Sequence, residues 1–130
     1  VMASFNIPTP QADHAARAGQ AALQAQAELA AARASQSSAI DVHFGMGVNT
    51  GAVVVGYVGF EDRFDYATLG ETTNIAFRFS SMAEPDQVLI GPATLSEVGE
   101  HAAVRPLGPL TLKGRSQPLP VYALEGWRAA

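Results

Sequence analysis

The sequence contains no cysteine among its 130 residues. A disulfide framework, a thiol nucleophile and a thiolate metal site are therefore excluded, and the absence fits a reducing compartment. Charge is also scarce, at 15% of residues, and the 12 acidic side chains outnumber the 8 basic ones to give a net charge of −4. This balance argues against broad binding of nucleic acid or anionic membranes, because both need a positive surface.

Long apolar runs are missing as well. The longest apolar stretches are too short to span a bilayer, and the opening VMASFNIPTP lacks the pattern of a signal peptide. We therefore expect no membrane contact from this segment and a cytoplasmic location, either alone or as the cytoplasmic domain of a larger protein. Apolar residues make up 48% of the chain, which is enough for the core of one small domain.

The patterns that are present alternate between helix and strand. An alanine-rich segment over about 11–35 has no β-branched residue and predicts a long helix. The turn Asn49-Thr50-Gly51 separates two β-rich runs and predicts a hairpin between them. Further expected elements are helices over 71–82 and 92–98 and strands over 63–69, 87–90, 104–112 and 119–124. The order of elements favours an α+β sandwich over a doubly wound parallel sheet.

The first five residues, Val1–Phe5, form a short apolar run that predicts a strand. The chain opens directly on it, so its neighbours on the N-terminal side would be missing. We therefore expect the domain to be truncated at its N-terminus.

Closely spaced glycines in FGMGVNTG (44–51) suggest a nucleotide loop at first sight. The spacing is G-x-G-x-x-x-G and a strand follows, whereas a dinucleotide fingerprint needs G-x-G-x-x-G before a helix. These glycines instead predict close backbone approach and a tight turn. The acidic group Glu61, Asp62 and Asp65 is a weak metal candidate, and the histidines His14, His43 and His101 lack ligand spacing and are expected to be structural or surface residues.

Asn74 and Arg78 form the strongest candidate pair. They lie one turn apart on the same face of the expected helix, while Ile75, Phe79 and Met82 form an apolar stripe on the other side. Asparagine is a mediocre helix former, so its place in the middle of a helix calls for a reason. From the pattern alone, two interpretations stay open.

One interpretation is an ordinary polar face, on which Arg78 pairs with Glu71 or Glu84. The other is that the pair points at an anion. The basic turn Lys113-Gly114-Arg115 is a second possible anion contact, although such turns are common.

Three segments together resemble a known family, the class III adenylate/guanylate cyclase catalytic domain of the bacterial type. The segments are FGMGVNTGAVVVGYVG, RFDYATLGETTNIAFRFSSMAEPDQVLI and RPLGPLTLKGRSQPLPVYAL. The resemblance covers residues 1–126 and leaves 127–130 as a C-terminal tail. It implies a ferredoxin-like α+β sandwich, incomplete at the N-terminus, and a head-to-tail dimer with active sites at the interface. The implied reaction converts ATP or GTP into the 3′,5′-cyclic nucleotide and pyrophosphate with two metal ions, Mg²⁺ or Mn²⁺.

The resemblance also assigns roles by position. Asn74 resembles the residue that orients the ribose, and Arg78 the arginine that stabilises the transition state. Lys113 resembles the basic residue that meets the terminal phosphates, with Arg115 as a second candidate. Ala67 occupies the position of a purine-binding side chain, usually Thr or Asp in the family, but a methyl group cannot hydrogen-bond a base.

The resemblance further implies that two metal-binding aspartates and a purine-selecting lysine precede Val1. No metal ligand is therefore expected in this chain, and by itself it is expected to be inactive. Two hypotheses follow. The chain is either part of a working nucleotidyl cyclase or a non-catalytic cyclase-like module for dimerisation or regulation, and Ala67 motivates the second.

Overall fold

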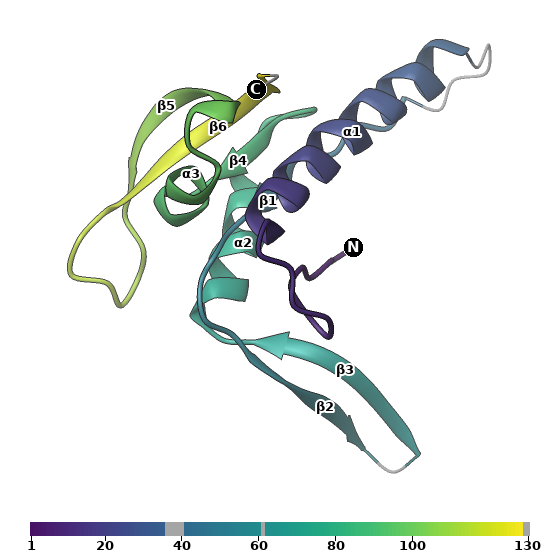
Figure 1. Cartoon of the computed structure of the whole chain (residues 1–130), viewed down its shortest axis with the longest axis vertical. Helices are drawn as coiled ribbons and strands as arrows, with labels where there is room; N and C mark the ends of the chain where they lie inside the picture. Colours follow the sequence, from purple (N-terminus) through teal and green to yellow (C-terminus); the bar gives the residue numbers. More distant parts are fainter. Residues whose placement is uncertain (36–40, 61, 129–130) are drawn as a thin grey trace.

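The computed structural model (Figure 1) describes residues 1–35, 41–60 and 62–128. Its helices are α1 (His14–Ser35), α2 (Glu71–Met82) and α3 (Pro92–Val98), followed by the short 3₁₀ turn η1 (Gly99–His101). Its strands are β1 (Met46–Val48), β2 (Val54–Phe60), β3 (Arg63–Leu69), β4 (Val88–Ile90), β5 (Ala102–Leu110) and β6 (Leu119–Trp127). The architecture is mixed α+β, as expected.

A four-stranded sheet in the order β1-β4-β6-β5 forms the centre of the molecule. β1 runs parallel to β4, and the other two pairings are antiparallel. Side chains of β4 alternate between two cores: Val88 and Ile90 pack with α1 and α3, while Leu89 packs with α2. Helices therefore cover both faces of the sheet, with α2 on one face and α1 and α3 on the other.

α2 has the bounds that the sequence predicts, and Ile75 and Phe79 are buried on its sheet side. Met82 was expected in the same stripe, but 44% of it is exposed, so that expectation is wrong. The helix ends there and the chain turns into an extended conformation at Ala83, which packs against the core instead. Gly70 precedes the helix at φ 127°, a conformation that favours glycine and explains the abrupt change from strand to helix.

The glycines before and within β1 allow the close approach that the sequence predicts. A Cβ atom on Gly47 would lie 2.4 Å from the carbonyl oxygen of Ala76 and 2.6 Å from the Cβ of Phe79. The backbone of β1 therefore lies directly on α2, and only glycine fits at this contact.

The expected hairpin at Asn49-Thr50-Gly51 is wrong. β1 pairs with β4, and β2 forms its hairpin with β3 instead. Polar side chains hold the 49–51 segment as a crossing between the two sheets: the Asn49 amide donates to the carbonyl oxygen of Thr72 (3.1 Å), and the hydroxyls of Thr50 and Thr94 lie 2.8 Å apart. These long-range bonds replace the local turn that the residue types suggested.

Several boundaries also differ. Val1–Phe5 is not a strand, because it pairs with no described strand; a contact of 3.4 Å between the hydroxyls of Ser4 and Thr68 links it to β3. α1 begins at His14 rather than near residue 11. β5 begins and ends two residues earlier than expected, and β6 continues to Trp127, whose ring stacks on His101.

Candidate functional site

The outer face of α2 carries the candidate pair. Asn74 and Arg78 are both exposed, and neither side chain makes a hydrogen bond or an ion pair with the residues that the structure describes. Arg78 does not pair with Glu71 or Glu84, so the interpretation of a self-satisfied polar face is not supported. Phe77 lies beside them in the sequence and is 54% exposed. This helix face therefore has an amide, a guanidinium and an aromatic ring free for contact.

The turn between β5 and β6 reaches the same helix. The Arg115 guanidinium donates to the Glu71 carboxylate across 3.1 Å. Glu71, Asn74 and Arg78 are spaced i, i+3 and i+7, so they follow one face of α2. The structure thus brings Arg115 to the face that carries the candidate pair. Lys113, in the same turn, is exposed and makes no polar contact with a described residue.

Ala67 lies on β3 directly opposite Gly56 of β2. Because side chains alternate along a strand, these two residues share a face with the opposed pair Val54 and Leu69, both largely exposed. A Cβ atom on Gly56 would meet no atom within 4 Å. The position expected to contact the purine therefore presents a methyl group with open space beside it.

The described residues contain no group of three or more His, Cys, Asp or Glu side chains that could hold a metal ion. Glu61 and the side chain of Asp65, two members of the weak acidic candidate, lie outside the described part. Across residues 1–35, 41–60 and 62–128, no helix has the length and apolar character needed to cross a membrane.

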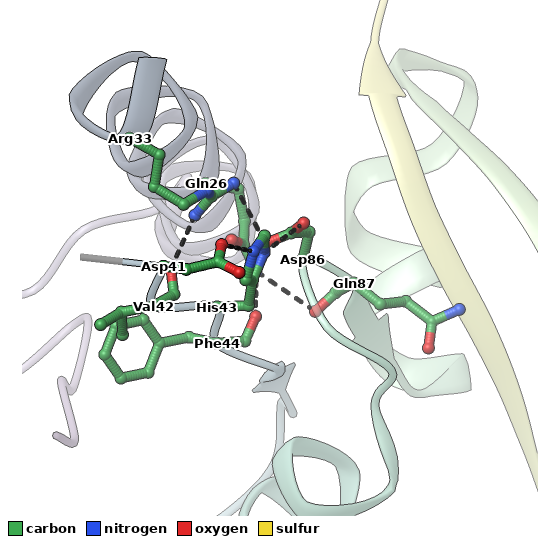
Figure 2. A network of polar contacts seen from close by, with 8 residues as sticks. All are labelled: Gln26, Arg33, Asp41, Val42, His43, Phe44, Asp86 and Gln87. Atoms are coloured by element: carbon green, nitrogen blue, oxygen red, sulfur yellow. Dashed lines mark hydrogen bonds and ion pairs between the residues drawn. The ribbon is translucent and has the colours of Figure 1, made fainter. Parts of the chain in front are cut away.

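His43 is the residue that sequence reasoning missed. Its two ring nitrogens lie against two different carboxylates, those of Asp41 and Asp86 (Figure 2). Asp86 raises the pKa of His43 most, and Asp41 adds to the effect. No spacing in the sequence signals this cluster, because Asp86 lies 43 residues further along the chain.

An open cavity of about 500 Å³ lies near this cluster, between α1, the turn after α2 and β6. Gln26, Asp86 and Glu125 are among the residues that line it. None of the five candidate site residues, Asn74, Arg78, Ala67, Lys113 and Arg115, lines it. The cavity is therefore separate from the candidate face of α2.

Comparison with known proteins identifies the family. Residues 1–126 match the model of the adenylate and guanylate cyclase catalytic domain. Adenylate cyclase 1 of Rhizobium meliloti (strain 1021) is 33% identical over 130 residues, which cover 97% of this chain. The chain therefore belongs to the adenylate and guanylate cyclase catalytic domain family.

Solved structures agree with this assignment. The guanylyl cyclase Cya2 superposes with a TM-score of 0.80 at 29% identity, over 95% of this chain and 64% of that one. The adenylyl cyclase CyaB from P. aeruginosa gives a TM-score of 0.79 at 29% identity, over 95% of this chain and 66% of that one. The fold is thus that of a class III cyclase catalytic domain. The chain spans about two thirds of these two structures and 20% of the Rhizobium protein.

Proposed function

We propose that this chain supplies Asn74 and Arg78 to the active site of a nucleotidyl cyclase that converts ATP or GTP into the 3′,5′-cyclic nucleotide and pyrophosphate. The observation that carries the proposal is that both side chains lie on the exposed face of α2 and have no polar partner among the residues that the structure describes. Membership of the cyclase family supports it. The cytoplasm, where ATP and GTP are available, is the proposed location.

The chemistry explains why these residue types suit the reaction. The ribose 3′-oxygen attacks the α-phosphorus, the bond from that phosphorus to the bridging oxygen breaks, and pyrophosphate leaves. Charge spreads over the phosphoryl oxygens during the transfer, and a guanidinium presents planar donors that match two of them. An amide both donates and accepts, so Asn74 can hold the ribose in line for attack. Lys113 and Arg115 are proposed to meet the terminal phosphates.

Two Mg²⁺ or Mn²⁺ ions would activate the hydroxyl and neutralise the phosphates. The described residues do not form a cluster that fits such ions. The proposed role of this chain is therefore to orient the nucleotide and to stabilise charge.

A second copy of the domain is the proposed partner, in a head-to-tail dimer. Figure 1 shows the β2–β3 hairpin extending away from the four-stranded sheet. Val54 and Leu69, directly opposite each other on this hairpin, are 67% and 49% exposed. Contiguous exposed apolar surface is a feature of protein interaction sites, and we infer that this hairpin carries one. A dimer would cover them and bring a partner toward the open face of α2.

Substitution of Arg78 tests the proposal. In the full-length protein, Arg78→Ala is expected to lower kcat by about 100- to 1,000-fold, because a donor to the transition-state charge is lost. Arg78→Lys should recover only part of the rate, since a lysine cannot form the two-pronged contact. Arg17→Ala is the matched control: Arg17 is an exposed arginine on α1 that pairs with Asp13, and its loss should leave kcat unchanged.

The alternative function is a non-catalytic cyclase-like module for dimerisation or regulation, and the methyl group at Ala67 favours it. Affinity for a non-hydrolysable ATP or GTP analogue separates the two. Binding that depends on Arg78 supports the cyclase. A folded dimer that binds neither analogue and makes no cyclic nucleotide with Mn²⁺ would overturn the proposed function in favour of the module.

A further inference from the structure

A cluster of four charged side chains ties three separate segments together (Figure 2). The Nδ1 atom of His43 lies 2.8 Å from both carboxylate oxygens of Asp86, and its Nε2 lies 2.6 Å from Oδ1 of Asp41. Arg33, near the end of α1, lies 3.3 Å from Oδ1 of Asp86 and donates to the carbonyl oxygen of Val42 across 2.9 Å. We call Arg33, Asp41, His43 and Asp86 the clasp.

The geometry of the clasp selects one protonation state. An ionised carboxylate only accepts hydrogen bonds, and a neutral imidazole has one N–H to donate. Only the imidazolium ion donates from both ring nitrogens, so only charged His43 satisfies Asp41 and Asp86 together. The two carboxylates accordingly raise the pKa of His43, while the Arg33 guanidinium opposes the rise.

The clasp joins the segment before β1 to the turn that follows α2. Asp86 in that turn has φ 69°, a conformation that costs free energy for a residue other than glycine. Its N–H donates to the carbonyl oxygen of Phe44 (3.1 Å), and the N–H of Met46 donates to that of Gln87 (2.9 Å). Gln26 of α1 adds a hydrogen bond of 2.8 Å to Phe44. The side-chain bonds of the clasp therefore reinforce a backbone contact at the C-terminal end of α2.

From the C-terminal end of α2, the contact between β1 and α2 continues along the helix. Gly47 of β1 lies on the backbone of α2 at Ala76, between the turns that carry Asn74 and Arg78. A shift of β1 relative to α2 would therefore move the candidate face with respect to the sheet, because the two backbones touch without side chains to absorb the change.

We propose that His43 is a positioning residue for the cyclase reaction: its imidazolium, held between Asp41 and Asp86, fixes the end of α2 on β1 and so sets how α2 presents Asn74 and Arg78. The catalytic part of this inference depends on the proposed function, whereas the clasp itself does not. Among the described residues, the charged groups that face His43 are Asp41 from its own segment, Asp86 from the turn after α2, and Arg33 from α1.

The direction of the pH effect follows from the shift. The pKa of His43 is raised in the folded chain above its ordinary value of 6.5. The clasp therefore stabilises the fold fully at pH values below 6.5, the ordinary pKa of histidine. This stabilisation is lost as the pH rises through the raised pKa that His43 has in the folded chain. The clasp should thus release as pH rises through a value above 6.5.

Two variants and one control test the inference in the full-length protein. His43→Gln removes the titrating group. Asp86→Asn removes one charge but keeps the backbone conformation, because asparagine tolerates positive φ. His14→Gln is the matched control, since the side chain of His14 makes no hydrogen bond or ion pair with a described residue. The measurements are the NMR titration of the His43 ring, the Tm as a function of pH, and kcat and KM as functions of pH.

We expect the His43 ring to titrate above 6.5 in the parent, and lower in Asp86→Asn. The Tm difference between the parent and His43→Gln should shrink as pH rises. Both variants should lower kcat by about twofold to tenfold at acidic pH, the range for residues coupled to a site at a distance, with KM nearly unchanged.

Titration of His43 at or below 6.5, or a Tm difference that does not vary with pH, would overturn the clasp. A second outcome would overturn the positioning role alone. In that case His43 titrates as expected and the enzyme is active, but His43→Gln and Asp86→Asn leave kcat and its pH profile unchanged. If the protein makes no cyclic nucleotide at all, the proposed function and this positioning role fail together, while the NMR and Tm measurements still decide the clasp.

Discussion

Arg115 and Glu71 form an ion pair of 3.1 Å that ties the turn between β5 and β6 to the first turn of α2. Both side chains are well exposed, at 39% and 66%, so the pair contributes about 0–1 kcal/mol at most. A triphosphate carries more charge than one carboxylate, and it can therefore compete for the guanidinium. Glu71 thus holds Arg115 on the face where the phosphates are proposed to bind.

Removing this competition should strengthen phosphate binding. Glu71→Gln is expected to increase the affinity for a non-hydrolysable ATP analogue by up to about fivefold, which corresponds to the free energy of an exposed ion pair. Isothermal titration calorimetry measures the change, and Glu28→Gln on α1 is the matched control. Weaker binding in Glu71→Gln would show that Glu71 supports the site by another route, and would contradict the competition.

The contact between β1 and α2 should be intolerant of one added methyl group. Gly47→Ala would place its Cβ 2.4 Å from a backbone oxygen of α2, so the two elements must move apart. We expect a loss of about 1–3 kcal/mol in the free energy of unfolding, as for other overpacked cores. Urea denaturation measures it. Gly56→Ala is the control, since its Cβ meets nothing within 4 Å and the change should be neutral or slightly stabilising. Equal stability of the two variants would contradict this account.

The β2–β3 hairpin should carry the dimer contact. Leu69→Lys places a charge on its exposed apolar face and is expected to weaken dimerisation by about tenfold or more, as for a residue at the centre of an interface. Leu107→Lys is the control, because Leu107 is a similarly exposed leucine on β5. Analytical ultracentrifugation over a range of protein concentrations gives both dissociation constants. A larger effect from Leu107→Lys would move the interface to β5.

Local signals explain which elements the sequence predicts correctly. α2 and α3 begin where the structure has them because a glycine precedes each helix, and in α3 a proline follows it. The predicted hairpin at Asn49-Thr50-Gly51 was wrong because the residue types of a tight turn also suit a crossing. β1 pairs instead with β4, in which each partner residue lies 42 positions further along the chain. The register of β1 against β4 depends on tertiary packing that no local window contains.

The sequence likewise predicts one part of the candidate site and misses another. Asn74 and Arg78 are found from helical spacing, since both lie on one continuous element. The Arg115–Glu71 pair and the clasp around His43 join residues 44 and 43 positions apart. Contacts at such separations depend on the fold as a whole, and the residue types alone predict only exposed charges.

Ala67 should limit the choice between adenine and guanine. Its methyl group offers neither a donor nor an acceptor, and the glycine opposite it leaves room for a larger side chain. Ala67→Thr adds one hydroxyl at this point. We expect the ratio of kcat/KM for ATP to that for GTP to change by about tenfold, the value of one hydrogen bond to a base edge. Steady-state assays with each nucleotide measure the ratio.

The control for this prediction is Ala52→Thr, which adds the same hydroxyl at an exposed position just before β2. It should leave the ratio unchanged, because residue 52 lies outside the paired part of the hairpin. If Ala67→Thr folds and dimerises like the parent but keeps the parent ratio, residue 67 does not face the purine. The base would then be read elsewhere, and the assignment of Ala67 to the nucleotide site would be wrong.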